Sequence, residues 1–180
     1  MGLAFLSSQT ASTSSSIDFT SGIDGTYNEY LFVFVNIHLA TLNAELQFQV
    51  NATDGADFND SPITSTFFGA YNDESGGTPA VAYHGGHDIA NAADTFQNLT
   101  YNQKIDNDSS MSGSMTLYDP SSTTYVKHFT ARTNGMMSNP SSVDNFAAGY
   151  INDTTAIDEI RFQSSSGNID AGTIYMYGVS

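Results

Sequence analysis

Cysteine and tryptophan are both absent from this chain of 180 residues. Without cysteine no disulfide can form, so stability has to come from apolar burial, hydrogen bonding or association with other chains. The same absence excludes a thiol nucleophile. Aromatic packing therefore rests on 12 Phe and 10 Tyr residues, and a hydrophobic content of 39% is enough for one core.

Basic residues are scarce, since 4 Lys and Arg stand against 19 Asp and Glu, which gives a formal net charge of −15. The four are Lys104, Lys127, Arg132 and Arg161. So few cations argue against nucleic-acid binding, because phosphate contacts need Lys and Arg, and against docking on anionic lipid. The acidity either keeps the surface soluble, suits a salt-rich medium that screens self-repulsion, or meets a basic partner or cations.

Long apolar runs are missing too, so we expect no membrane-spanning helix. Residues 1–6 are mildly apolar but lack the basic start and the length of a signal peptide. Charged residues make up only 13% of the chain, and Ser, Thr, Asn, Asp and Gly fill the polar positions. This composition is typical of turn-rich β proteins and disfavours long helices.

Alternation of apolar and polar residues predicts a series of short strands along the chain. Residues 30–38 are aromatic and β-branched almost throughout, which predicts a central strand buried on both faces. In 45–51 the side chains of Leu46, Phe48 and Val50 share one face, the half-buried antiparallel pattern. The further predicted strands are 17–20, 63–71, 80–84, 112–118, 124–133, 146–152, 156–163 and 172–178.

Turn signals every 8 to 15 residues or so favour a single all-β domain, an antiparallel two-sheet sandwich or a small barrel, over 17–180. A short helix at 88–97 is the one helical alternative, and its apolar spacing is poor. Residues 1–16 are predicted to form a flexible N-terminal arm, because 7–16 are nearly all Ser, Thr, Gln and Ala. Leu3, Phe5 and Leu6 either anchor this arm on a neighbouring subunit or belong to a frayed terminus.

Two loops carry candidate metal ligands. His84, His87 and Asp88 flank a Gly pair and could ligate a transition metal, although a plain polar turn explains them as well. Asp54 and Asp57 lie in an oxygen-rich loop that could take calcium, but the spacing is not that of an EF-hand and an Asx-turn loop is the simpler explanation.

Signatures of catalysis are missing from the sequence: it has no Gly-x-Ser-x-Gly elbow and no phosphate-binding Gly-rich loop ahead of a helix. We therefore expect no enzyme. Phe68, Tyr71 and Tyr83 lie near Gly-rich turns, where aromatic side chains could contact a sugar or a protein partner. Core packing is the alternative role for them.

Several short phrases occur together in one order along the chain. They are IDFTSGI at 17–23, TYNEY at 26–30, FVNIH at 34–38, ITSTF at 63–67, DPSSTTYVKH at 119–128 and IYMYGV at 174–179. This series resembles a family of small structural proteins of tailed phages, especially marine ones. The resemblance implies a virion component with a β-sandwich of jelly-roll type, and it brings no catalytic motif.

The resemblance leaves the position in the particle open. One expectation is a capsid decoration (cement) protein on the virion surface, made in the host cytoplasm. It would be a homo-oligomer, with a trimer favoured, that contacts the major capsid protein. The alternative is a tail- or fibre-associated module that contacts tail proteins and binds a host surface glycan.

Overall fold

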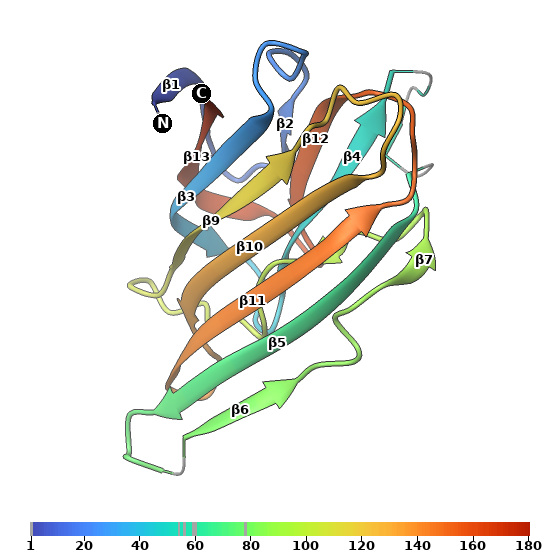
Figure 1. Cartoon of the computed structure of the whole chain (residues 1–180). Coiled ribbons are helices and arrows are strands. Elements are labelled where there is room, and N and C mark those ends of the chain that lie inside the picture. The colour runs from blue at the N-terminus through green and yellow to red at the C-terminus, as the bar shows by residue number, and fades with distance from the viewer. Residues whose placement is uncertain (1, 54, 56, 59–60, 78) are drawn as a thin grey trace.

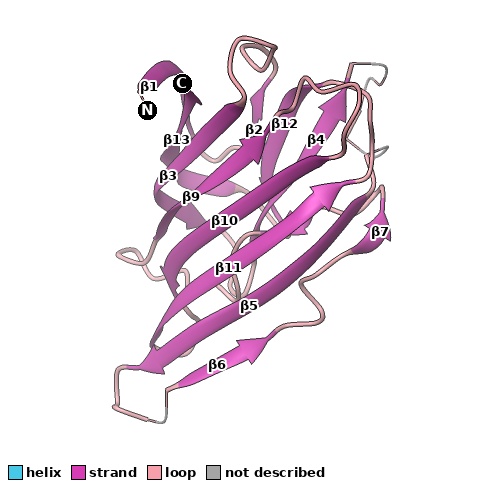
Figure 2. Cartoon of the chain, in the orientation of Figure 1, coloured by secondary structure: helices cyan, strands magenta, loops and turns pink. Residues whose placement is uncertain are grey.

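The computed structural model describes residues 2–53, 55, 57–58, 61–77 and 79–180. Every regular element within these residues is a strand (Figure 2). None of these residues forms a helix that could cross a membrane. The strands are β1 (Leu3–Thr10), β2 (Ser16–Phe19), β3 (Glu29–Leu39), β4 (Leu46–Ala52), β5 (Ile63–Asp73), β6 (Ala80–Tyr83), β7 (Ala90–Ala92), β8 (Gln97–Asn98), β9 (Met111–Tyr118), β10 (Lys127–Met136), β11 (Ser141–Ile151), β12 (Ile157–Ser164) and β13 (Ile169–Val179).

The strands form two antiparallel sheets that pack face to face (Figure 1). The large sheet has 9 strands in the order β1-β13-β3-β9-β10-β11-β5-β6, with β7 also paired to β5. The small sheet has 4 strands in the order β2-β12-β4-β8. The predicted all-β sandwich is thus confirmed. The jelly-roll arrangement is not, because the strands divide very unequally between the sheets.

Aromatic side chains fill the space between the sheets. Phe162 of β12 lies within ring-contact distance of Phe19, Phe32, Phe34 and Phe48, with centroids 5.3 to 6.5 Å apart. All five side chains are buried. Because a fully buried Phe contributes about 1.5–3 kcal/mol, this cluster is a main source of stability in a chain without disulfides.

Each strand predicted from the sequence overlaps an observed one. Residues 30–38 are not buried on both faces: Tyr30, Phe32 and Phe34 point inward, whereas Val35 is exposed on the outer face. The helical alternative at 88–97 is wrong, since this segment contains β7 and turns.

The N-terminal segment differs from the predicted flexible arm. β1 pairs with β13 along its whole length, and Gly2 and Ser180 exchange backbone hydrogen bonds of 2.8 and 3.1 Å. The segment joins the domain without a break at residue 16, because Ser16 already belongs to β2. An edge strand needs little burial, so Ser, Thr and Gln are tolerated there once the backbone is paired.

Candidate binding surfaces

Flat side chains form a row across four neighbouring strands on the outer face of the large sheet, the face that points away from the small sheet. Tyr83 of β6, Phe68 of β5, Phe146 of β11 and Arg132 of β10 are successive cross-strand partners. The rings of Phe68 and Phe146 stack at 4.9 Å with 6° between their planes. The Arg132 guanidinium carbon lies 5.1 Å from the Phe146 ring centroid. We call these four residues the aromatic ridge.

An ion pair holds the end of the ridge in place. Arg132 donates from Nε and Nη2 to the Asp144 carboxylate at 3.0 and 2.7 Å. These hydrogen bonds raise the pKa of Arg132. The Arg132 side chain is 67% exposed, so the pair adds little stability and mainly fixes the orientation of the guanidinium.

Beside the ridge runs a second cross-strand row of short side chains. It consists of Ser112, Asn134, Asp144, Ala70 and Val81, from β9, β10, β11, β5 and β6 in turn. Two hollows lie along it and share Asp144, one of about 390 Å³ on the β9 side and one of about 410 Å³ on the β6 side. We call this row the trough, since larger side chains border it on the ridge side.

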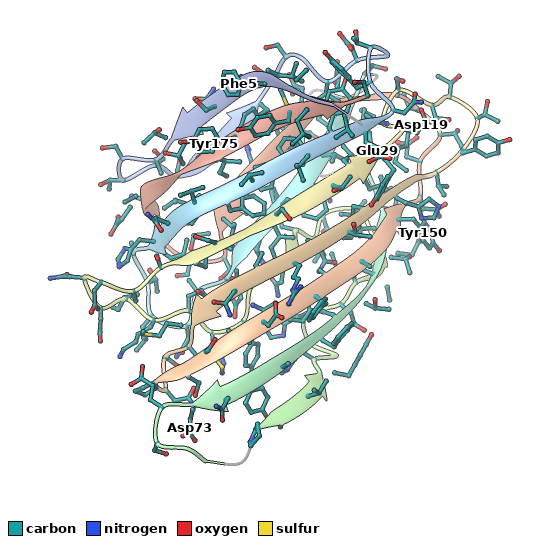
Figure 3. All side chains as sticks on the ribbon, turned by 60° about the vertical axis from the view of Figure 1, so that its left-hand side comes forward. Phe5, Glu29, Asp73, Asp119, Tyr150 and Tyr175 are labelled. Atoms are coloured by element: carbon teal, nitrogen blue, oxygen red, sulfur yellow. The ribbon has the colours of Figure 1, made fainter. Side chains whose placement is uncertain are left out.

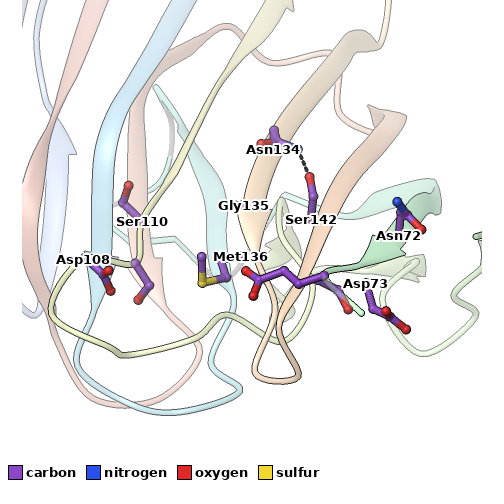
Figure 4. A pocket seen from close by; sticks show the side chains of 11 residues that line it. Asn72, Asp73, Asp108, Ser110, Asn134, Gly135, Met136 and Ser142 are labelled. Carbon is purple, nitrogen blue, oxygen red and sulfur yellow. Dashed lines mark hydrogen bonds between the residues drawn. The ribbon is translucent and has the colours of Figure 1, made fainter. Parts of the chain in front are cut away.

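A third hollow, of about 490 Å³, lies at the ends of β5, β10 and β11 and joins the trough at Asn134 and Ser142 (Figure 4). Asp73, Glu74 and Asp108 make it acidic. A hydrogen bond from Ser75 and another from the Gly77 N–H lower the pKa of Asp73. This carboxylate is therefore engaged in closing its own turn.

The two edges of the large sheet carry apolar, uncharged strands. On β1, Leu3 and Phe5 are 60% and 59% exposed, and on β6, Val81 and Tyr83 are 73% and 58% exposed. Figure 3 shows Phe5 near one edge of the sheet and Asp73 at the far side. Exposed apolar groups on a sheet edge are uncommon, because natural edges are protected by charge, proline or cover.

The backbone of both edges is available for pairing. The His84 N–H bonds to the Phe67 carbonyl, so by antiparallel alternation the polar backbone groups of Val81 and Tyr83 point away from β5. On the other edge, the mutual backbone hydrogen bonds of Gly2 and Ser180 set the same alternation. The backbone N–H and C=O groups of Leu3 and Phe5 therefore point away from β13.

Not all of the predicted contact residues share a surface. Phe68 and Tyr83 lie opposite each other on the outer face, whereas Tyr71, three residues along β5 from Phe68, falls on the other face by alternation. Of the predicted anchor residues, Leu3 and Phe5 are exposed, but Leu6 packs against the core. A register shift between Phe5 and Ser7 accounts for the inward turn of Leu6.

Sequence reasoning missed Phe146, Arg132 and Asp144. One signal was present, because Phe146 falls out of phase with the inward positions Val143, Asn145 and Ala147 of the same strand. The phase shows that Phe146 points outward. It does not show that Phe68 lies beside it.

The side chains of the predicted transition-metal site at residues 84–88 lie in different surroundings, although the His84 and His87 rings are in contact, with centroids 6.0 Å apart. The His84 ring stacks on Tyr101 with centroids 4.2 Å apart. Asp88 accepts a hydrogen bond from the Tyr83 hydroxyl, and His87 Nε2 lies 3.4 Å from a Glu45 carboxylate oxygen. Within the described ranges, no group of three or more His, Asp or Glu side chains is placed to hold a metal ion.

Protonation in this cluster is biased by its surroundings. Burial, and then the neighbouring His87, lower the pKa of His84, whose Nε2 is buried without a hydrogen-bond partner. Burial acts to raise the pKa of Glu45, but hydrogen bonds from His87 and Ser165 outweigh it and the pKa is lowered. In the predicted calcium loop, Asp57 is exposed and Asp54 lies outside the described residues.

Each of the four basic side chains is engaged within the chain. Arg132 pairs with Asp144, Arg161 with Asp18, and Lys104 with Asp106, each at 2.7 Å. Lys127 is fully buried and donates to the backbone carbonyls of Asp153 and Thr155. The uncompensated surface charge is therefore negative.

Comparisons with protein-family models, with curated proteins and with solved structures find no match to this chain.

Proposed function

We propose that this chain is a structural protein of a tailed-phage virion that decorates the capsid and stabilises it through subunit contacts. The sequence resemblance supplies the virion setting. The observation that carries the structural role is the pair of open, apolar edges on the large sheet. An exposed edge is a template for adding a strand from another chain, since its free N–H and C=O groups pair with any extended backbone.

Charge restricts where two such acidic chains can approach each other. Residues 2–17 contain no Asp, Glu, Lys or Arg, and neither do residues 75–87. These segments include β1 and β6, so contacts there bring together neutral stretches of a chain whose net charge is −15. Because each copy has one β1 edge and one β6 edge, a head-to-tail contact is possible. Such contacts close into a ring, a trimer among them, when the rotation between copies closes, and otherwise extend into a filament.

The edge contact is tested by placing a charge on it. We expect the double substitution Leu3→Lys and Phe5→Lys to abolish self-association and capsid binding, because a buried unpaired charge opposes strand addition. Thr130→Lys is the matched control, since Thr130 is an exposed residue of the interior strand β10 and the new lysine lies away from both edges. Light scattering after gel filtration gives the oligomeric state, and cosedimentation with capsids that lack the protein gives binding. Unchanged assembly and unchanged capsid binding in the double variant would contradict the proposal.

A second candidate function is a tail- or fibre-associated module that binds a host surface glycan. It is favoured by one observation, the presence of Phe68 and Tyr83 side by side on the outer face rather than in the core. Imaging the particle with labelled protein separates the two functions, because decoration places many copies over the head and the alternative places few on the tail.

A further inference from the structure

The trough on the outer face has the shape of a site for a linear ligand. Its five residues come from five adjacent strands, and at about 4.8 Å between strands the row is roughly 20 Å long. The ridge runs parallel to the trough, two residues away along each strand. A ligand in the trough would therefore cross the strands, with flat side chains along one flank.

The groups in the trough specify hydrogen bonding without net charge. Asp144 is neutralised by Arg132, and the other polar residues that line the two hollows are neutral; they include Ser112, Asn134 and Ser142. The acidic hollow around Asp73 adjoins the trough and disfavours an anionic ligand. The chemistry favours an uncharged ligand rich in hydrogen-bonding groups.

A peptide fits this place poorly. Extended peptides bind sheets through backbone pairing at an edge, whereas β9, β10, β11 and β5 are interior strands whose backbone groups pair with their neighbours on both sides. In the trough only side chains remain for recognition, which suits hydroxyl groups on a ring-based chain.

We propose that the trough binds a neutral, linear oligosaccharide. Its hydroxyl groups bond to the side-chain oxygen of Asn134, the Ser112 hydroxyl and the free carboxylate lone pairs of Asp144, and the apolar faces of its rings lie against the exposed parts of Phe68 and Tyr83. The Asn134 amide nitrogen already donates to Ser142 and the Val143 carbonyl, and the Ser112 oxygen already accepts from the Asn36 N–H. The guanidinium of Arg132 has N–H donors beyond those that Asp144 accepts, and its side chain is 67% exposed. This site develops the second candidate function, whose exposed Phe68 and Tyr83 it uses. It lies apart from the β1 edge contact of the structural role, and it adjoins the β6 edge contact through Val81 and Tyr83.

The test uses the full chain and two sets of probes. The first contains linear hexasaccharides of glucose, mannose, galactose and N-acetylglucosamine, and the second contains sulfated and uronic-acid chains of similar length. We expect binding to at least one neutral probe and none to the anionic set. For the neutral probe, Phe68→Ala and Asn134→Ala should each raise Kd at least tenfold by titration calorimetry.

Tyr175→Ala is the matched control, since Tyr175 is an aromatic residue of the same outer face on β13, away from the trough (Figure 3). It should change Kd less than twofold, and thermal melts followed by circular dichroism show that each variant is folded. No binding to any neutral probe overturns the proposal. So does a preference for anionic chains, or equal affinity in the trough variants and the wild type. The Leu3→Lys and Phe5→Lys protein should bind the neutral probe normally even if it no longer assembles, which separates failure of this site from failure of the structural role.

Discussion

The inner and outer faces of the large sheet are built from the same strands but have different roles: the inner face packs against the small sheet, and the outer face is exposed. The inner positions of β3 and β10, such as Phe32 and Phe129, are buried against the small sheet. The outer positions of β9, β10 and β11 mix Ser, Thr and Asn with larger side chains, among them the aromatic ridge and the neighbouring His128 and Tyr150 rings. The period of two in a strand therefore separates residues that fix the fold from residues that are free to bind.

The largest difference between the faces is expected for phenylalanine. Phe162→Ala opens a cavity at the centre of the aromatic cluster and should lower the free energy of unfolding by about 3–5 kcal/mol. Phe146→Ala removes a half-buried ring from the outer face and should cost about 1 kcal/mol or less. Urea denaturation of both variants measures the difference. Equal losses would show that the ridge is part of the core.

Lys127 is a fully buried basic residue on the inner face, and the next largest effect is expected there. Lys127 projects from β10 and holds the carbonyls of Asp153 and Thr155 in the loop before β12. Burial lowers the pKa of this ammonium, while Asp153 and Asp119 act to raise it. Lys127→Met keeps the length of the side chain but removes the ammonium that donates to the two carbonyls. This loss should lower the free energy of unfolding by about 1–3 kcal/mol.

Hydrogen exchange and urea denaturation check this prediction. Amides of 152–155 should exchange faster in Lys127→Met, because the loop loses its attachment. Thr130→Met, a substitution on the outer face of the same strand, is the control and should leave exchange in the loop unchanged. Full stability in Lys127→Met would mean that water replaces the ammonium without loss.

The sequence predicted the inner face better than the outer one. Alternation identified β4, β9 and β12 because their inward residues are apolar. It missed the start of β11, where the inward residues Ser141 and Asn145 are buried but polar. It missed β1 because pairing with β13, and not composition, makes that segment a strand.

The candidate site depends on how distant strands pair, which no local sequence pattern specifies. Phe68 and Phe146 meet only because β5 and β11 pair in one particular register. A shift of one residue would send one of the two rings to the opposite face. The surroundings of His84 and His87 could not be predicted for a related reason, since Tyr101 and Glu45, which lie beside the imidazoles, come from distant segments.

The smallest expected effect is a dependence of stability on pH. It arises at His84, in a part of the inner face that the small sheet does not cover. His84 lies there beside Tyr101 and Phe67, with Nε2 buried. Because burial lowers the pKa of His84 in the folded chain, the unfolded chain takes up the proton first as the pH falls below about 6.5. The stability associated with a neutral His84 is therefore complete above that pH and is lost progressively below it.

A second loss begins at lower pH, since the lowered pKa of Glu45 makes its contribution decline only below about 4.5. Between these two values the decline in melting temperature should come from His84 and should be small, because the side chain is only half-buried.

His84→Phe retains a ring against Tyr101 and removes the proton site, so its melting temperature should stay level from pH 6.5 to 5. His38→Phe is the control, because His38 lies on the outer face of β3 near the Asp106 carbonyl, and the decline should persist in that variant. If the melting temperature of His84→Phe also declines over this pH range, His84 is not the source of the decline. The inner face around His84 then tolerates a charge much as the outer face does.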